Sequence, residues 1–490
     1  MTRNSHSTRL SPWERVLESV TANVVRGNSG QPFAAASIKA FAVYVVGAAL
    51  SYLTQLVIAR TIGAESFGIY AYVLAWMTLL GYLSTLGFHV SLLRFVPTYR
   101  AKQHWPLVRG VIRYSQQRAA CVGIAIILVG AWAIFALEGF IRPELATTFL
   151  FGIAAVPVIA LHLISASVAR AFGGVVTALA PERIVRDCAS LVIMAVASWS
   201  NLVRPDARLA IVASLVSALV TLALLRIAMR RLRPPELEHE TPEFAAKEWW
   251  RPTFPLMGIT VADNVMSRSG VILLGLSGNT RHAGVFAVAF SMALLTALPR
   301  MAVGAIFAPR VSDLFARGDR PGLQTLLGRA ACLSLVGTAG AALPLVLIAS
   351  PLLSWFGRDF VEGAPIVTIL VLGQLFAAAC GPQQHLITMT AHEQMGAAIL
   401  AGSAALNLAA CLLMIGPLGM TGAALAMTGS LIVWNVAMGV FNYRRLHLVP
   451  GLVASFRHFY PQCEGDPPRA LQARSASGSA PSQKSLTGVE

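Results

Sequence analysis

Long apolar segments recur along the whole chain and are separated by short polar connections. A helix of about 20 apolar residues is long enough to cross a hydrocarbon layer roughly 30 Å thick. Segments of this kind cover residues 38–58, 68–90, 119–137, 148–168, 184–203, 209–227, 254–276, 283–307, 330–348, 364–386, 396–415 and 420–441. The chain is also 56% hydrophobic and only 12% charged, which is more apolar than a single soluble core accounts for. We predict an all-α, polytopic membrane protein with about 12 transmembrane helices.

Basic residues predict the orientation of these helices, because cytoplasmic connections carry an excess of Lys and Arg. With the N-terminus inside, the inner connections hold 30 of the 38 Lys and Arg residues and the outer turns hold six. The inner total includes Arg183 and Arg186, because the fifth segment, 184–203, has Arg186 and Asp187 in its expected first turn. We therefore expect both termini to be cytoplasmic.

The net charge of +16 does not indicate nucleic-acid binding, because the basic residues lie between apolar segments and not in a patch with aromatic stacking platforms. Six cysteines are scattered through the chain without a CxxC pair. We therefore expect neither a disulfide framework nor a metal site.

The pattern divides the chain into five regions. Residues 1–37 form a cytoplasmic segment, in which Ser11-Pro12-Trp13-Glu14 has the form of a capping box that opens an interfacial amphipathic helix. Residues 38–227 form an N-terminal lobe of six spans, and residues 253–446 form a C-terminal lobe of six spans. A cytoplasmic linker, 228–252, joins the lobes. Residues 447–490 form a cytoplasmic tail that is rich in Pro, Ser and Ala and is expected to be disordered.

Two turns of the chain share one pattern. Residues 63–71 read GAESFGIYA and residues 278–287 read GNTRHAGVFA. Each has a glycine, a few polar residues, and then a glycine, an aliphatic residue, an aromatic residue and an alanine. The turns enter the second and eighth predicted spans, so the two halves repeat one plan. Halves with an even number of spans enter the membrane in the same direction, and transporters commonly place the substrate route between such repeats.

The first of these turns also carries a resemblance to a known family. ARTIGAESFGIYAYV followed by LGFHVSLLRFVP resembles the N-terminal signature of the polysaccharide flippase family, the Wzx-type lipid-linked oligosaccharide translocases of the multidrug and oligosaccharidyl-lipid exporter superfamily. HAGVFAVAFSMALLTALP, IFAPRVSDLFARGDRPGLQTLLGRA and TAHEQMGAAILAGSAALNLAACLLMIGPLGMTGAALA extend the resemblance through the second half, so that it covers about residues 38–446.

The resemblance implies a two-lobed helical bundle around a central cavity that opens alternately to either side of a bacterial inner membrane. It implies that polyprenyl-diphosphate-linked sugar units move from the inner to the outer leaflet, for O-antigen, capsule or exopolysaccharide. It implies membrane lipids and polysaccharide polymerase machinery as partners, no cofactor and no enzymatic step.

Three charged residues inside predicted spans are the first candidates for substrate binding. Asp263 and Arg268 lie in segment 254–276, and Arg300 follows Pro299 in segment 283–307. A charge in the middle of a membrane helix costs about 2.5–3.5 kcal/mol on insertion scales, so such residues are usually functional. One hypothesis is that Arg268 and Arg300 attract the diphosphate at different stages while Asp263 binds a coupling cation or holds an Arg. The alternative is that all three serve structural intramembrane ion pairs.

Arg60 and Arg94 are two further candidates, because both match the family motif. Their positions at the ends of the first and second spans are equally compatible with snorkelling to the lipid headgroups. The stretch SRSGVILLG departs from the family, because many relatives carry an acidic residue shortly before LLG and here that stretch contains Gly270. Asp263 lies further upstream, which puts in doubt the transfer of that acidic role to it.

Competing functions remain open from the sequence, among them a peptidoglycan-precursor flippase, which usually has more spans, and a structural or scaffold role. A drug or metabolite exporter of the same superfamily would share the fold and the repeat but would favour an acidic cavity for cations. A membrane glycosyltransferase or polymerase would need paired carboxylates in a sizeable loop. The outer turns here are short, and their acidic residues stand singly or beside an Arg.

Overall fold

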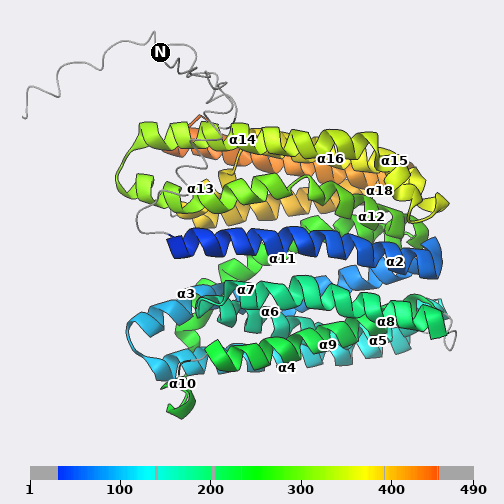
Figure 1. Cartoon of the computed structure of the whole chain (residues 1–490), viewed down its shortest axis with the longest axis horizontal. Helices are drawn as coiled ribbons and strands as arrows, with labels where there is room; N and C mark the ends of the chain where they lie inside the picture. Colours follow the sequence, from blue (N-terminus) through cyan, green and yellow to red (C-terminus); the bar gives the residue numbers. More distant parts are fainter. Residues whose placement is uncertain are drawn as a thin grey trace, which may run out of the picture.

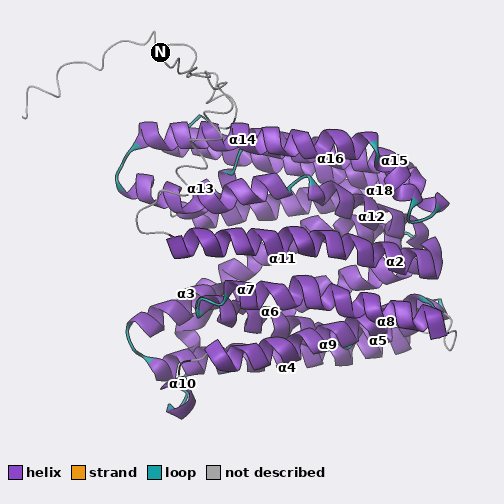
Figure 2. Ribbon diagram, in the orientation of Figure 1, coloured by secondary structure: helices purple, strands orange, loops and turns teal. Residues whose placement is uncertain are grey.

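The computed structural model describes residues 31–449 and residue 451, apart from residues 138, 140, 141, 201–204, 233, 235 and 391. Every regular element in this part of the chain is a helix (Figure 2). The amphipathic helix predicted before residue 31 and the tail beyond residue 451 lie outside the described residues. The all-α prediction is confirmed for the described residues.

The first half of the bundle runs from α2 to α9. Its elements are α2 (Gln31–Ser84), α3 (Phe88–Ala101), α4 (Trp105–Ala136), α5 (Pro143–Ile153), α6 (Ala155–Ala171), α7 (Val175–Ala180), the π-helical segment η1 (Pro181–Val185), α8 (Arg186–Ser200) and α9 (Ala207–Leu232). A short helix, α10 (Glu236–His239), lies in the connection to the second half.

The second half runs from α11 to the end of the described chain. Its elements are α11 (Ala246–Leu276), α12 (Thr280–Leu295), α13 (Leu298–Ala316), α14 (Arg320–Leu347), α15 (Ala349–Ser354), the 3₁₀ segment η2 (Arg358–Gly363), α16 (Ala364–Cys380), α17 (Gln383–Met389), α18 (Glu393–Phe441) and the π-helical segment η3 (Asn442–Leu446).

Several of these helices are long and apolar enough to cross a membrane. Within the described residues there are 8 such helical stretches, or 9 if α12 and α13, which meet at a bend of 47°, count as one span. Two stretches, Ala42–Ala101 with 60 residues and Gln394–Leu446 with 53 residues, are each more than twice the length that one crossing needs. Each is broken by a glycine at positive φ, Gly63 at 78° and Gly419 at 55°. The protein is therefore a multi-pass membrane protein, while the count of 12 stays a prediction.

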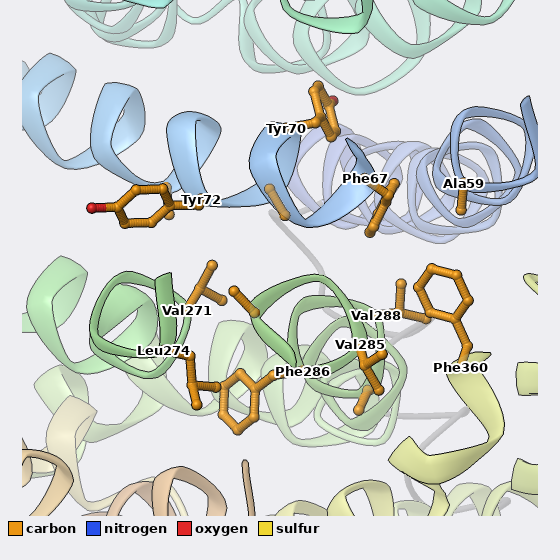
Figure 3. Close-up of a cluster of buried hydrophobic side chains, with 14 of the residues drawn as sticks. Ala59, Phe67, Tyr70, Tyr72, Val271, Leu274, Val285, Phe286, Val288 and Phe360 are labelled. Carbon is orange, nitrogen blue, oxygen red and sulfur yellow. The ribbon is translucent and has the colours of Figure 1, made fainter. Parts of the chain in front are cut away.

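Two bundles of helices lie on either side of α2 and α11, which run through the middle of the molecule (Figure 1). At the end of the molecule that holds the turns at Gly63 and Gly278, both halves contribute to one hydrophobic core. In it, Phe67 of α2 packs edge-to-face on Phe360 of η2, with ring centroids 5.7 Å apart (Figure 3). We call this the joined end.

The opposite end, which holds the turns at residues 102–104 and 317–319, has separate cores. One core lies within the first half, around Phe88, Val111 and Ile164, and includes Trp249 from the start of α11. Another core lies within the second half, around Phe307 and Leu327. We call this the split end, because the two halves meet there mainly through the first turns of α11.

A glycine pair explains how the halves approach so closely at the joined end. Gly68 of α2 faces Gly284 of α12: a Cβ built on Gly284 would lie 2.8 Å from the Gly68 Cα. A Cβ on Gly68 would lie 1.8 Å from the carbonyl oxygen of Thr280. These two glycines occupy the same place in the two repeated turns of the sequence. The repeat therefore brings equivalent backbones into direct contact.

Each repeated turn is also held by ion pairs to a later segment of its own half. In the first half, Glu65 pairs with Arg142 at 3.2 Å. In the second half, Arg281 pairs with Asp359 at 3.3 Å and with Glu362 at 3.2 Å. The two arrangements are alike in place and opposite in sign, which fits a repeated plan with independently varied residues.

Candidate functional site

The main group of charges inside the first half lies where the sequence predicted an inner connection. The helix that contains Arg186 begins at Val175, just after Gly173 reverses the chain at φ 90°. It continues without a break through η1 into α8. At 1.5 Å per residue, Arg186 lies about 16 Å along this helix. The prediction that Arg186 and Asp187 lie in a first turn at 184 is therefore wrong.

The local sequence explains the position of η1 against α2. A Cβ on Gly47 of α2 would lie 2.7 Å from the Cβ of Arg183, so glycine lets the two helices touch. The Arg183 guanidinium lies over the ring of Tyr44, 5.0 Å from its centroid. A π-helical turn adds one residue to the helix and is frequent at functional sites. Here it sets the direction of three charged side chains, at positions 182, 183 and 186.

Acidic partners balance only part of this positive charge. Arg186 Nε lies 3.3 Å from Asp187 Oδ1, and His162 Nε2 lies 3.8 Å from Glu182 Oε2. The Arg186 side chain keeps 43% of its surface accessible in spite of its depth along the helix. Part of this side chain is therefore free of contact with the rest of the protein.

Arg268 approaches this group from the second half. It lies on α11 and interacts electrostatically with Arg186 and with the hydroxyl of Tyr82 on α2. Tyr82 also interacts electrostatically with Glu182 and Arg183, so it senses the charges of both halves. The Arg268 Nε is buried and has no hydrogen-bond partner within the described part of the chain. We call Tyr82, Arg183, Arg186 and Arg268 the cationic cluster.

Two guanidinium groups from opposite halves thus come within electrostatic range of each other. Like charges repel strongly where the dielectric constant is low, and an unpaired buried charge is costly. An anion between the two groups would remove both costs, because Arg binds carboxylate and phosphate oxygens with paired hydrogen bonds. Whether the two groups bind an anion stays a prediction.

Arg300 lies apart from the cationic cluster. It is in the first turn of α13, directly after the bend that follows α12. Its Nη2 donates to the Oε1 of Gln374 on α16 at 3.4 Å, and it interacts electrostatically with His385 on α17. The structure therefore separates Arg268 from Arg300, and the two remain separate predictions as substrate contacts.

Of the other three predicted site residues, only Asp263 interacts with a member of the cationic cluster. Asp263 is exposed on α11 and has no ion pair within the described residues, although it interacts electrostatically with Tyr82. Arg60 donates from Nε to the carbonyl oxygen of Trp355 and so links the halves at the joined end. Arg94 is exposed on α3, and its carbonyl oxygen accepts a hydrogen bond from the Thr98 hydroxyl at 2.7 Å. The roles proposed for Asp263, Arg60 and Arg94 stay predictions.

Hydropathy averages hide a few charges at the start of a helix. The sequence therefore did not mark three charged residues as site candidates: Glu182, Arg183 and Arg186. One signal was available. Residues 173–180 read GGVVTALA and precede Pro181, which is a glycine helix boundary followed by an apolar helical turn. Read that way, the helix starts at 175 and its charges fall within it.

An apolar groove lies beside the cationic cluster. It has a volume of about 350 Å³ and lies between the end of α2, α11 and α18. Leu83, Val261, Val265 and Ala404 are among its lining residues. Val265 is three residues from Arg268, about 5 Å along α11. In the described part of the chain, no three His, Cys, Asp or Glu side chains are grouped so that they could hold a metal ion.

Comparison with protein families gives one match. The family described as "polysaccharide biosynthesis protein" matches residues 35–315, which is more than half of the chain. No curated protein matches the sequence.

Solved structures with the same fold are membrane transporters. An inward-facing multidrug resistance MATE family transporter of the MOP superfamily has a TM-score of 0.67 at 12% identity, over 82% of this chain and 94% of its own. An outward-facing transporter of that family has a TM-score of 0.61 at 12% identity, over 87% and 97%. The lipid II flippase MurJ, in an inward closed conformation, has a TM-score of 0.59 at 14% identity, over 82% and 87%. At these identities the likeness is one of fold.

Proposed function

The chain belongs to the polysaccharide biosynthesis protein family, and from that premise we propose that it is an alternating-access flippase for polyprenyl-diphosphate-linked oligosaccharides. In this proposal two lobes, residues 38–227 and 253–446, carry the substrate across a bacterial inner membrane for surface polysaccharide export. The protein performs no covalent chemistry. Its partners are membrane lipids and, in the cell, the polysaccharide polymerase machinery.

The observation that carries the proposal is the electrostatic interaction between Arg186 and Arg268, which come from opposite halves of the chain. A diphosphate carries at least two negative charges and can accept hydrogen bonds from both groups at once. Because each half provides one of them, a bound diphosphate would also hold the halves in a defined relation.

The apolar groove supports the same class of substrate. An amphiphile with an anionic head at Arg268 and a hydrocarbon tail would place the tail along α11, where Val261 and Val265 line the groove. Burying hydrocarbon chain there removes it from polar surroundings near the cluster, at about 0.8 kcal/mol per CH₂ group.

The excess of Lys and Arg supports an orientation with the split end toward the cytoplasm. Moving Arg183 and Arg186 from the inner connections into a helix reduces the inner total only from 30 to 28, against six at the outer turns. The described structure then corresponds to a state closed outside and separated inside. A substrate from the inner leaflet would reach the cationic cluster in this state.

The second candidate is a multidrug or metabolite exporter, since two of the structural neighbours are multidrug resistance transporters. The cationic cluster disfavours organic cations as substrates, because an added positive charge would meet Arg183, Arg186 and Arg268. The MurJ neighbour, a lipid II flippase, favours lipid-linked substrates.

The proposal is tested with full-length protein in liposomes that carry a fluorescent polyprenyl-diphosphate oligosaccharide. Exposure of the sugar at the opposite leaflet is measured for wild type, Arg186→Ala, Arg268→Ala and Arg300→Ala. Arg329→Ala is the matched control, because Arg329 is exposed on α14. We expect Arg186→Ala and Arg268→Ala to lose at least about tenfold in rate, as for removal of a charge-assisted hydrogen bond.

Three results would count against parts of the proposal. Equal transport by wild type and both cluster variants would keep the function but remove the site. Loss in Arg300→Ala alone would move the anion route to α13. No movement of the lipid-linked sugar, together with efflux of an organic cation from the same vesicles, would replace the flippase by a drug exporter.

A further inference from the structure

The described chain ends in a short segment that lies against the second half at the split end. The segment consists of His447, Leu448, Val449 and Gly451, which follow η3, and we call it the strap. Its first residue, His447, has a φ of 55°, the left-handed conformation that commonly ends a helix. The strap thus contains the first residues of the predicted cytoplasmic tail.

The strap is fixed to α14 by a pair of hydrogen bonds and to the core by one apolar side chain. Gln324 on α14 donates from Nε2 to the carbonyl oxygen of Val449 at 3.0 Å, and the N–H of Val449 donates to Gln324 Oε1 at 2.8 Å. Leu448 is 2% exposed and packs in the core that α13 and α14 share with Leu386 of α17. The strap therefore joins three helices that are distant in sequence.

The strap also lies at the break between α16 and α17. The two helices are separated at Gly381, which has a φ of 78° and a ψ of −174°. A Cβ built on Gly451 would lie 2.5 Å from the carbonyl oxygen of Ala379, at the end of α16. Just before the strap, Asn442 donates from Nδ2 to Oε1 of Gln383 at 3.3 Å, at the start of α17. Both sides of the break are thus held from the same direction.

Helix α17 carries a side chain into the neighbourhood of Arg300. His385 of α17 lies against α13, since a Cβ built on Gly304 would be 2.8 Å from the His385 Nε2. The same histidine interacts electrostatically with Arg300, which is in the first turn of α13. The position of α17 therefore determines which group lies beside Arg300.

Two features of the seated strap are unfavourable. His447 is not a glycine, so its left-handed backbone conformation is strained. The Oδ1 atom of Asn442 is buried and has no hydrogen-bond partner within the described residues, which costs stability. Both costs fall when the strap leaves, because His447 relaxes and Asn442, which accepts from the N–H of Leu448 through its carbonyl oxygen, is uncovered on that side. Such a segment can open locally while the rest of the half stays folded.

We propose that the strap is a latch for α17. When the strap is seated, it holds α17 against α13. When it is released, α17 turns about Gly381 and carries His385 away from Arg300. The latch thereby controls which groups are available beside Arg300 during the transport cycle. This movement is independent of the chemical class of the substrate.

Hydrogen exchange of the α17 amides in the full-length protein, followed by mass spectrometry, measures release of the latch. Leu448→Ala removes most of the buried side chain and should speed exchange in α17 at least about tenfold. His447→Gly should slow it about threefold, because the strain that it removes exceeds the flexibility that it adds to the released chain. A segment that only fills space would not show this slowing.

Two variants serve as matched controls. Gln103→Gly makes the same kind of change in the first half, where Gln103 is exposed and has a φ of 57°. Leu413→Ala shortens a leucine of α18 that is 77% exposed. Neither should alter exchange in α17. Unchanged α17 exchange in folded Leu448→Ala, or equal slowing by Gln103→Gly and His447→Gly, would overturn the inference.

A reducible cross-link tests whether the latch opens during transport, and this measurement rests on the proposed function. Gln324→Cys and Val449→Cys are combined in a background without the native cysteines and joined by a short methanethiosulfonate cross-linker. We expect the cross-linked protein to lose transport in the liposome assay and to regain it on reduction. Equal transport before and after reduction would overturn the latch. Absence of transport by wild type would instead overturn the proposed function, and the exchange rates of α17 would then decide whether the latch exists.

Discussion

The glycine crossing at the joined end makes a sharp prediction about the balance between conformations. Replacing Gly68 by alanine puts a Cβ 1.8 Å from the carbonyl oxygen of Thr280. Real Cβ contacts are essentially never shorter than 3.0 Å, so the two backbones have to separate by more than an ångström. Because the obstacle is backbone and not the tip of a side chain, the helices α2 and α12 themselves have to move.

The size of the effect follows from the cost of overpacking. Inserting a methyl group into a packed contact costs about 1–3 kcal/mol, which changes a two-state population by about 5–150-fold. The conformation described here, with the joined end closed, carries this cost. A conformation in which the halves part at that end does not. Gly68→Ala should therefore shift the protein toward the conformation that is open at the joined end.

Spin labels on exposed turns of the two halves measure this shift. Leu137 and Arg358 are suitable positions in a cysteine-free background, since both side chains are exposed near the joined end. Pulsed dipolar spectroscopy should show a longer distance becoming dominant in Gly68→Ala. Gly429→Ala is the control, because nothing lies within 4 Å of a Cβ at that position. Identical distance distributions for the two variants would refute the reasoning.

Three further predictions concern stability. Trp249 is fully buried and its Nε1 donates to the Tyr99 hydroxyl at 3.0 Å, so Trp249→Ala should cost about 3–5 kcal/mol and Trp249→Phe about 1 kcal/mol, read as a large and a small fall in Tm. Arg281→Ala removes two exposed ion pairs and should cost at most about 1 kcal/mol, so its Tm should stay close to that of wild type. Asn407→Leu removes the 2.6 Å hydrogen bond from Nδ2 to Ser269 Oγ between α18 and α11, a bond worth about 0.6–1.7 kcal/mol in a membrane bundle. The Tm of each variant is measured by thermal unfolding in detergent without urea. A Trp249→Ala protein with the same Tm as Arg281→Ala would contradict the packing argument.

The fold was accessible from the sequence because the membrane leaves few alternatives. A backbone in hydrocarbon has to satisfy its own hydrogen bonds, so long apolar segments form helices. The repeated turns at Gly63 and Gly278 were also readable, and both residues do take positive φ, at 78° and 82°. That Gly68 and Gly284 touch each other was not readable, because spacing along the chain says nothing about which equivalent positions meet.

The candidate site was only partly accessible. Arg268 could be singled out because it interrupts an apolar segment, where a charge is expensive. Arg186 could not, because its helix begins 11 residues earlier in a stretch with an apolar turn too short to raise an average. The pairing of Arg186 with Arg268 depends on how two halves pack, which is a property of tertiary structure.

The place where the shared core stops explains why the charges gather where they do. On α2 the shared core reaches Met77 and Tyr82 follows five residues later; on α11 it begins at Val271, three residues after Arg268. Toward the joined end the halves are sealed by apolar contact, which a charge would break. Toward the split end each half closes its own core. The boundary between the shared core and the separate cores is therefore the deepest level at which a polar group from one half can face the other half without being enclosed by apolar side chains. A headgroup held at this level would reach the opposite side of the membrane only if the joined end opened.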